Sequence, residues 1–260
     1  MEACAVAFAD RRELPLGDWT PCLSVREQVE ASTYRSPRRG RTITSRILTK
    51  YLVTDPDTSP FRRLGAGDID AVKGVDWAAC EVLSGTAKAR HGATIVRFGQ
   101  TCSGLSASSA HCGTYTASCI GRDRVGLDLE RIDGRRPEFY AQTFSADEQA
   151  WVAAVVGRDD AAAAFTVLWT VKEAYLKASG RTDISIWAFP RWTVRFDETV
   201  DDVFHAARAE EFVRVSGGIH RPGFSQPLEI AAMRVDDMIL TTVQYREAPD
   251  CDVLEAIKHD

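Results

Sequence analysis

The sequence contains no long apolar run, and this absence restricts where the protein is expected to reside. No stretch has the roughly 18 consecutive apolar residues that a membrane-spanning helix needs, so no membrane span or membrane partner is expected. The chain begins with one weakly apolar stretch, Ala3 to Ala9, which has no basic start and is followed at once by charged residues. Because a secretory signal combines a basic start with a longer apolar core, the sequence predicts a cytoplasmic protein.

Paired cysteine motifs are missing as well. The seven cysteines are an odd number, and no two of them have the two-residue spacing that is typical of zinc and redox motifs. A disulfide framework is typical of chains too short to bury a large core, whereas this chain has 260 residues of which 45% are hydrophobic. Free thiols in a reducing compartment are therefore expected.

Short-period repeats and low-complexity tracts are also absent, and the composition that remains is that of an ordinary globular protein. Charged residues make up 27% of the chain, and 260 residues suffice for one large domain or two small ones. The net charge is −5. We expect a monomer with no nucleic-acid partner.

The charge is unevenly distributed between the two halves. Residues 1–123 hold 16 Lys and Arg against 13 Asp and Glu, a balance of +3, whereas residues 124–260 hold 16 against 24, a balance of −8. An acidic half that follows a basic half is consistent with a metal site beside an anion site. The alternative is the ordinary variation of a few charges between parts of a protein, and composition alone does not separate the two.

Hydrophobic periodicity predicts a mixture of helices and strands, and therefore an α+β fold. Apolar residues at helical spacing predict helices over residues 42–52 and 161–179, and a capping box of Ser145 and Glu148 predicts another that runs to about Val156. Alternation and β-branched residues predict the strands. The predicted strands are 92–97, 115–120, 124–130, 192–196, 211–215, 228–235 and 238–245.

Two carboxylates lie two residues apart on the predicted strand 124–130. Side chains alternate between the faces of a strand, so Asp128 and Glu130 point to one side, and Leu127 and Leu129 point to the other side, into the core. Such close carboxylates repel each other unless a cation lies between them, and oxygen ligands of this kind suit Mg²⁺. A solvated strand face is the alternative for an isolated Asp-x-Glu.

The predicted helix 161–179 places Trp169, Glu173 and Lys177 along one stripe, because they are four residues apart. On a solvated helix, Glu173 and Lys177 would form an ordinary surface ion pair of about 0.3–0.5 kcal/mol. Trp169 argues against full exposure of the stripe. A carboxylate between an indole and an ammonium is placed to bind a metal ion or to handle a proton.

Three segments in this order resemble the signature of the Sfp-type 4′-phosphopantetheinyl transferases. That family carries Gly-x-Asp-x-Glu on a strand, then Phe-Ser-x-x-Glu, then Trp-x-x-Lys-Glu-x-x-x-Lys-x-x-Gly on a helix. The chain has Gly126-Leu-Asp128-Leu-Glu130, Phe144-Ser145-Ala-Asp-Glu148 and Trp169-Thr-Val-Lys172-Glu173-Ala-Tyr-Leu-Lys177-Ala-Ser-Gly180. The resemblance covers roughly residues 24–245 and is strongest over 108–180.

The coenzyme-binding positions of the family are matched less completely. A Ser-His pair of the family corresponds to Ala110-His111 here, so His111 is matched and one hydroxyl is absent. The basic segment from Arg38 to Lys50 is similar to an early Arg-rich helix of the family, in which Arg41 corresponds to a position near the 3′-phosphate of coenzyme A. The family's Gly-Lys-Pro turn has no clean match, and the segment containing Arg90 is one of two candidates for it.

The resemblance implies a pseudo-dimer of two similar halves, each a long helix packed on a small antiparallel sheet. Residues 1–122 would hold the 3′-phosphoadenosine end of coenzyme A, and residues 123–260 would hold the metal and the catalytic groups. The implied reaction moves the 4′-phosphopantetheine group from coenzyme A to a serine of an apo acyl or peptidyl carrier protein, and releases adenosine 3′,5′-bisphosphate. Carriers of secondary metabolism, which make polyketides and nonribosomal peptides, are the usual partners.

The resemblance also implies roles for the site residues. Mg²⁺ would be held by Asp128, Glu130 and Glu173, with Lys177 beside the phosphate or the leaving group. Glu173 would remove the proton from the serine, directly or through a water molecule. Lys172 is expected to face away, toward the diphosphate or solvent.

Two rival hypotheses remain at this stage. A degenerate relative would bind coenzyme A or carrier protein without transfer, which is consistent with Ala110 and the unmatched turn. An unrelated magnesium phosphohydrolase would use the same acidic residues but explains neither Trp169 nor His111.

Overall fold

The computed structural model divides into two units, which are described separately. The N-terminal unit comprises Met1–Val125 together with the residues from Arg246 onward, and the C-terminal unit comprises Gly126–Tyr245. The structure describes residues 4–14, 19–54, 61–65, 67–68, 77, 80–83, 94–98, 101–132, 139, 142–154, 158–180, 186–197 and 212–246. Among these residues, no helix is both long enough and apolar enough to cross a membrane.

The N-terminal unit is a sheet packed with helices. Its strands lie in the order β2-β1-β6-β5-β4-β3, all antiparallel except the β1–β2 pair. The helix α2 packs against β1 and β6, and α1 packs against α2. The elements are β1 (Ala5–Asp10), η2 (Thr20–Cys22), α1 (Val25–Ser32), α2 (Arg38–Thr54), β2 (Phe61–Arg63), β3 (Cys80–Leu83), β4 (Thr94–Phe98), β5 (Thr101–Cys112) and β6 (Tyr115–Gly121).

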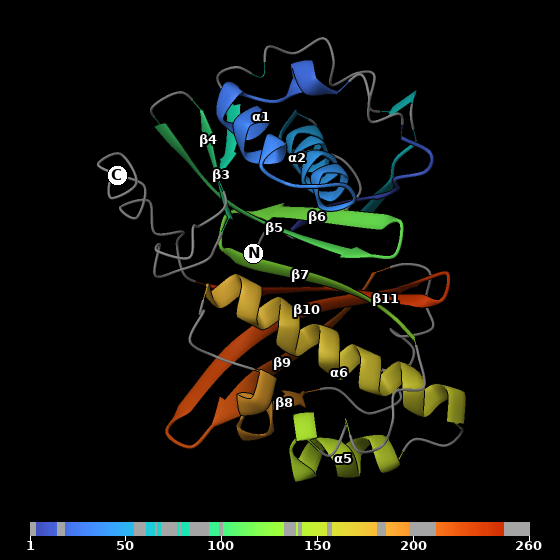
Figure 1. Cartoon of the computed structure of the whole chain (residues 1–260). Coiled ribbons are helices and arrows are strands. Elements are labelled where there is room, and N and C mark those ends of the chain that lie inside the picture. The colour runs from blue at the N-terminus through green and yellow to red at the C-terminus, as the bar shows by residue number, and fades with distance from the viewer. Residues whose placement is uncertain are drawn as a thin grey trace. The chain divides into compact units, whose positions relative to one another are not determined.

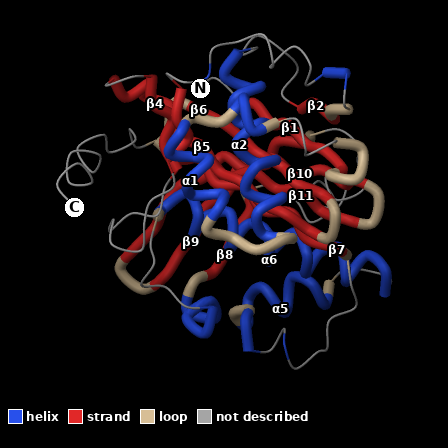
Figure 2. The backbone as a smooth tube through the Cα atoms, turned by 45° about the horizontal axis from the view of Figure 1, so that its top comes forward, coloured by secondary structure: helices blue, strands red, loops and turns tan. Residues whose placement is uncertain are grey.

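The C-terminal unit has the same architecture. Its sheet has the order β7-β11-β10-β9-β8, and the long helix α6 lies along it and contacts β11 (Figure 1). Figure 2 shows the strands of this sheet in red and the helices α5 and α6 in blue. The elements are β7 (Arg124–Arg131), α5 (Ala146–Ala153), α6 (Arg158–Ser179), η4 (Ile186–Arg191), β8 (Thr193–Phe196), β9 (Val213–Arg221), β10 (Phe224–Val235) and β11 (Met238–Tyr245).

The two units repeat one chain order. In each unit a first strand precedes a short helix and a long helix, and four antiparallel strands follow, the last of which pairs with the first strand. The described N-terminal unit differs by the short strand β2, which adds to the outer edge of β1. The predicted α+β fold of two similar halves, each a long helix on a small sheet, is therefore confirmed.

One buried ion pair occupies the same place in each unit. Lys50 Nζ lies 2.6 Å from Glu27 Oε2, and Lys172 Nζ lies 2.6 Å from Glu148 Oε2, with all four side chains at most 1% exposed. Each Glu closes the capping box of its short helix and also accepts a hydrogen bond from a strand amide, Val82 N for Glu27 and Val194 N for Glu148. Each pair therefore joins the short helix, the long helix and an edge strand.

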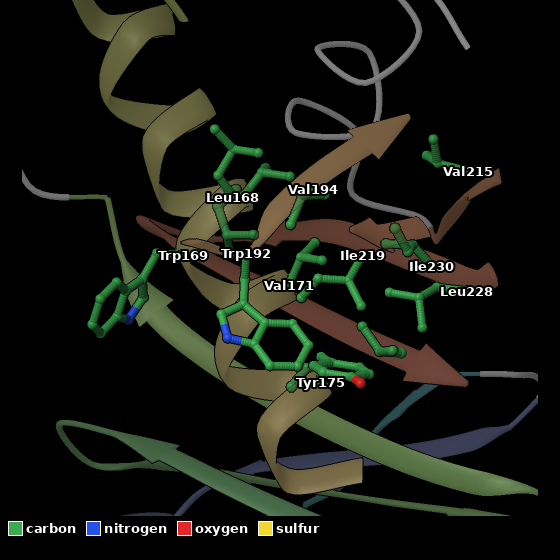
Figure 3. Close-up of a cluster of buried hydrophobic side chains, with 14 of the residues drawn as sticks. Leu168, Trp169, Val171, Tyr175, Trp192, Val194, Val215, Ile219, Leu228 and Ile230 are labelled. Atoms are coloured by element: carbon green, nitrogen blue, oxygen red, sulfur yellow. The ribbon is translucent and has the colours of Figure 1, made fainter. Parts of the chain in front are cut away.

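The core of the C-terminal unit lies between α6 and its sheet. Tyr175 and Trp192 have ring centroids 5.8 Å apart, and they lie beside Val171, Ile219 and Leu228 (Figure 3). These aromatic and branched side chains fix the position of α6 over the strands.

Candidate functional site

The glycine of the Gly-x-Asp-x-Glu segment lies where α6 approaches β7 most closely. A Cβ atom at Gly126 would be 1.8 Å from the carbonyl oxygen of Ala174 and 2.8 Å from the amide nitrogen of Ala178. No side chain fits that gap, so the sequence must have glycine for the helix to pack directly on the strand. This contact brings the last turns of α6 next to the residues that follow Gly126 on β7.

Asp128 and Lys177 form the ion pair at this junction. Lys177 Nζ donates to Asp128 Oδ1 at 2.7 Å and to the carbonyl oxygen of Leu127 at 3.0 Å. The carboxylate of Asp128 is 7% exposed, and the Lys177 side chain is 33% exposed. Asp128 therefore points toward α6, and the ammonium group that it meets belongs to a side chain that is one-third exposed.

The second oxygen of Asp128 has no hydrogen-bond partner within the described ranges. Oδ2 is buried, and no described residue donates to it. A buried carboxylate oxygen without a donor costs about 1–3 kcal/mol, or more when charged, unless a cation or another donor meets it. This oxygen therefore fits the first carboxylate ligand that the sequence predicts for Mg²⁺.

Glu130 and Glu173 belong to the same two elements as Asp128 and Lys177. Glu130 follows two residues later on β7, and Glu173 lies one helical turn before Lys177 on α6. Both side chains are partly buried, whereas Leu127 and Leu129 are at most 1% exposed, as expected for the opposite face of the strand. Within the described ranges, no group of three or more His, Cys, Asp and Glu side chains is gathered closely enough to form a ready metal site. The ligand set of three carboxylates remains a prediction, and Asp128 is the member with a structural observation behind it.

Trp169 anchors the other end of the predicted stripe. It is 9% exposed, and its ring centroid lies 5.2 Å from that of Phe139 and 5.5 Å from that of Phe189. Its indole points away from the cluster around Trp192 (Figure 3). Trp169 is thus a packing residue, which holds α6 through aromatic contacts.

The expectation that Lys172 faces the diphosphate or solvent is wrong. Its side chain is 1% exposed, and besides Glu148 its Nζ donates to the carbonyl oxygens of Thr143 at 3.3 Å and Phe189 at 3.1 Å. Burial lowers the pKa of Lys172, and the adjacent Glu148 opposes this change. The sequence motif showed the helical neighbours of Lys172, but its partner Glu148 lies 24 residues away and appeared only as a helix cap.

The basic residues predicted for coenzyme A lie in the N-terminal unit. Arg41 is in the first turn of α2 and is partly buried, and its Nε is buried with no hydrogen-bond partner among the described residues. His111 lies near the end of β5 with an exposed side chain, next to the buried Ala110. Arg90 lies outside the described residues.

Comparisons with known proteins agree with the motif-bearing segment. The family model of the 4′-phosphopantetheinyl transferase superfamily matches residues 124–215, which contain β7, α5, α6 and β8. The 4′-phosphopantetheinyl transferase gsp of Aneurinibacillus migulanus is 31% identical over 72 residues, which are 28% of this chain and 30% of that protein. The chain thus aligns with less than a third of the length of this curated relative. The segment that contains the acidic strand, the capped helix and the Lys-Glu helix is therefore similar to the 4′-phosphopantetheinyl transferase superfamily.

Proposed function

We propose that the protein transfers the 4′-phosphopantetheine group of coenzyme A to a serine of an apo acyl or peptidyl carrier protein. The observation that carries this proposal is the junction of β7 and α6. There a buried aspartate, one oxygen of which has no hydrogen-bond partner in the described part of the chain, meets a lysine inside the segment that matches the superfamily. Phosphoryl-type transfer depends on charge neutralisation and alignment, and this pair supplies both an anionic and a cationic group.

In the proposed reaction the serine oxygen attacks the β-phosphorus of coenzyme A. A new P–O bond forms, the bond to the bridging oxygen of the diphosphate breaks, and adenosine 3′,5′-bisphosphate leaves. Glu173 accepts the serine proton, directly or through a water molecule that it orients. Lys177 stabilises the negative charge on the phosphate or the leaving group, which it can reach because its side chain is one-third exposed.

Mg²⁺ fits the donor set, since carboxylate oxygens are the ligands that this ion prefers. Asp128 would hold it through Oδ2, together with Glu130 and Glu173, and the ion when bound would neutralise the diphosphate. In the N-terminal unit, Arg41, His111 and Arg90 are proposed to contact the coenzyme, which assigns its 3′-phosphoadenosine end to residues 1–122.

The test is a mass measurement. The protein is incubated with coenzyme A, Mg²⁺ and a panel of apo-carriers from fatty-acid, polyketide and nonribosomal-peptide synthesis. A gain of one phosphopantetheine group on a carrier supports the proposal, and a serine-to-alanine carrier is the matched control. Coenzyme A binding without any mass gain would favour the degenerate relative, and hydrolysis of coenzyme A without a modified carrier would favour the phosphohydrolase.

A further inference from the structure

The short helix α1 carries an exposed apolar pair on its outward side. Val25 is 78% exposed and Val29 is 60% exposed, and within the described ranges no other large hydrophobic side chain is exposed to this degree. The two valines are four residues apart, so they lie next to each other on one face of the helix. Single exposed apolar residues are ordinary on a protein surface, but an adjacent pair in a chain that buries its other large apolar side chains requires an explanation.

The C-terminal unit shows that the fold does not require these valines. The glutamates of the two buried ion pairs close equivalent capping boxes, and α1 and α5 each bury that glutamate and the residue four positions later. Val25 and Val29 are therefore equivalent to Ala146 and Ala150, which are also exposed. Valine is a poorer helix former than alanine, because its branched side chain loses rotamer freedom in a helix. The two valines thus favour neither the helix that contains them nor its contact with water.

The first turn of α1 differs from that of α5 in its charge as well. The exposed residue Arg26 is equivalent to Asp147, which pairs with Arg195. Near the N-terminus of a helix a carboxylate is favourable and a cation is unfavourable, because the backbone amides give this end a partial positive charge. Arg26 therefore does not stabilise its own helix, as the valines beside it do not.

The surface that continues from the valines is basic. The two carboxylates of the segment 25–39 are directed to cations of α2, since Glu27 pairs with Lys50 at 2.6 Å and Glu30 pairs with Arg46 at 3.0 Å. The exposed charged side chains of the segment are all arginines, namely Arg26, Arg35, Arg38 and Arg39. The outward side of α1 therefore complements a partner that presents carboxylates beside apolar side chains.

The kind of side chain favours a protein helix over other anionic partners. The exposed residues of α1 and its C-cap are Val25, Arg26, Val29, Ser32 and Thr33, none of which is aromatic. Nucleic-acid bases stack on aromatic side chains, and a helix that lies on a membrane inserts large residues such as Trp, Phe and Leu. Two small branched side chains one turn apart instead match the way in which packed helices fit their side chains together.

We propose that the outward side of α1, formed by Val25, Arg26 and Val29, is a docking surface for an acidic amphipathic helix of a partner protein. The two valines pack against the apolar stripe of that helix, and Arg26 pairs with a carboxylate beside the stripe. A contact of this small size is typical of a weak and transient complex. The inference goes beyond the proposed function, and neither coenzyme A nor a transfer step enters it.

The experiment measures the binding of two synthetic amphipathic helical peptides by titration calorimetry. Both peptides carry the same stripe of leucines, which is flanked by glutamates in one peptide and by lysines in the other. The wild type should bind the glutamate peptide at least about tenfold more tightly, because Arg26 attracts carboxylates and repels ammonium groups. Arg26→Asp should reduce this preference to within about threefold. Val25→Ala combined with Val29→Ala should weaken the binding of both peptides by a similar factor.

Two further variants separate a docking role from a structural one. The triple variant Val25→Ala, Arg26→Asp, Val29→Ala copies the outward residues of α5, so it should unfold at a temperature no lower than the wild type. It should bind the glutamate peptide at least about tenfold more weakly. Arg214→Asp reverses the charge of an exposed arginine of the C-terminal unit, and should leave both affinities unchanged.

Three results would overturn the proposal. The first is a wild type that binds neither peptide or both equally, and the second is a triple variant that keeps the wild-type affinity for the glutamate peptide. The third is flotation of the wild type, but not of the triple variant, with vesicles of phosphatidylserine and phosphatidylcholine, which would assign the surface to a membrane. Because no carrier or coenzyme is used, failure of the docking surface leaves the proposed function untouched, and the two failures are distinguishable.

Discussion

The two units share one scaffold and differ in what the first strand presents to the long helix. The amide of Arg11 donates to the carbonyl oxygen of Thr114 in the turn before β6, and the amide of Ile132 donates to that of Asp237 in the turn before β11. Arg11 is therefore equivalent to Ile132, Ala7 to Asp128 and Ala9 to Glu130. Ala7 and Ala9 are completely buried in the core with α2, whereas Asp128 meets Lys177 of α6. The buried Glu–Lys pair therefore belongs to the scaffold, since both units have it, whereas the acidic strand is a property of one unit.

The long helices differ in the same way. The residue after the buried lysine is Tyr51 in α2 and Glu173 in α6. Tyr51 is 6% exposed and belongs to the apolar core of its unit. The carboxylates of the C-terminal unit are therefore not required by the fold, which is the physical reason to regard them as functional.

The largest effect is expected from breaking the buried pairs. Lys50→Met and Lys172→Met each leave a buried glutamate without its ammonium partner, which should cost about 3–5 kcal/mol of unfolding free energy. Because the two pairs are equivalent, the two losses should be similar. Urea denaturation of both variants measures this, and a large loss in only one of them would break the equivalence of the two scaffolds.

A smaller loss is expected at Gly126, where the units differ in helix packing. The equivalent residue of β1 is Ala5, so a Cβ is tolerated there, whereas Gly126→Ala would place its Cβ 1.8 Å from the Ala174 carbonyl oxygen. Overpacking of this kind should cost about 3 kcal/mol. Gly67→Ala is the control, because nothing lies within 4 Å of a Cβ at that position. A Gly126→Ala variant as stable as the Gly67→Ala control in a thermal melt would show that the helix does not rest on the strand as described.

The smallest effect is expected at Asp10, whose equivalent in the C-terminal unit is Arg131. Hydrogen bonds from Arg12 lower the pKa of Asp10 from 3.8 to about 2. A carboxyl group with a lowered pKa stabilises the folded state at pH values above the pKa that the group has in the unfolded chain. This contribution is lost as the pH falls through about 2. Asp10→Asn should therefore lose about 1 kcal/mol or less at neutral pH, since Arg12 is mostly exposed, and nothing near pH 2. Melting temperatures between pH 2 and 7 test this, and a difference that grows toward low pH would contradict the assignment.

Much of the C-terminal unit was predictable from local signals. Alternation gave β7, the capping box of Ser145 and Glu148 gave the start of α5, and Gly180, with φ of 62°, ends α6 as expected. The N-terminal unit contains similar local signals, but α1 and β5 were not predicted from them. Ser24 and Glu27 form a capping box for α1, but its eight residues contain too few apolar side chains to show a helical period. The strand β5, Thr101–Cys112, is rich in serine and lacks alternation, so pairing with β4 and β6 determines it.

The site was predictable only where its chemistry depends on spacing. Asp128 and Glu130 on one strand face, and Glu173 and Lys177 on one helix stripe, follow from the periods of a strand and a helix. The burial of Lys172 depends on Glu148, and the role of Gly126 depends on Ala174, both of which are distant in sequence.

The most direct test of the central claim is the rate of phosphopantetheine transfer by Asp128→Ala and Glu173→Ala at saturating Mg²⁺. If the acidic junction of β7 and α6 is where the chemistry occurs, both variants should lose transfer while their thermal unfolding stays close to that of the wild type. The fold should survive because Ala7 already occupies the position equivalent to Asp128 in the N-terminal unit. Transfer by either folded variant within about threefold of the wild-type kcat/KM would contradict the account.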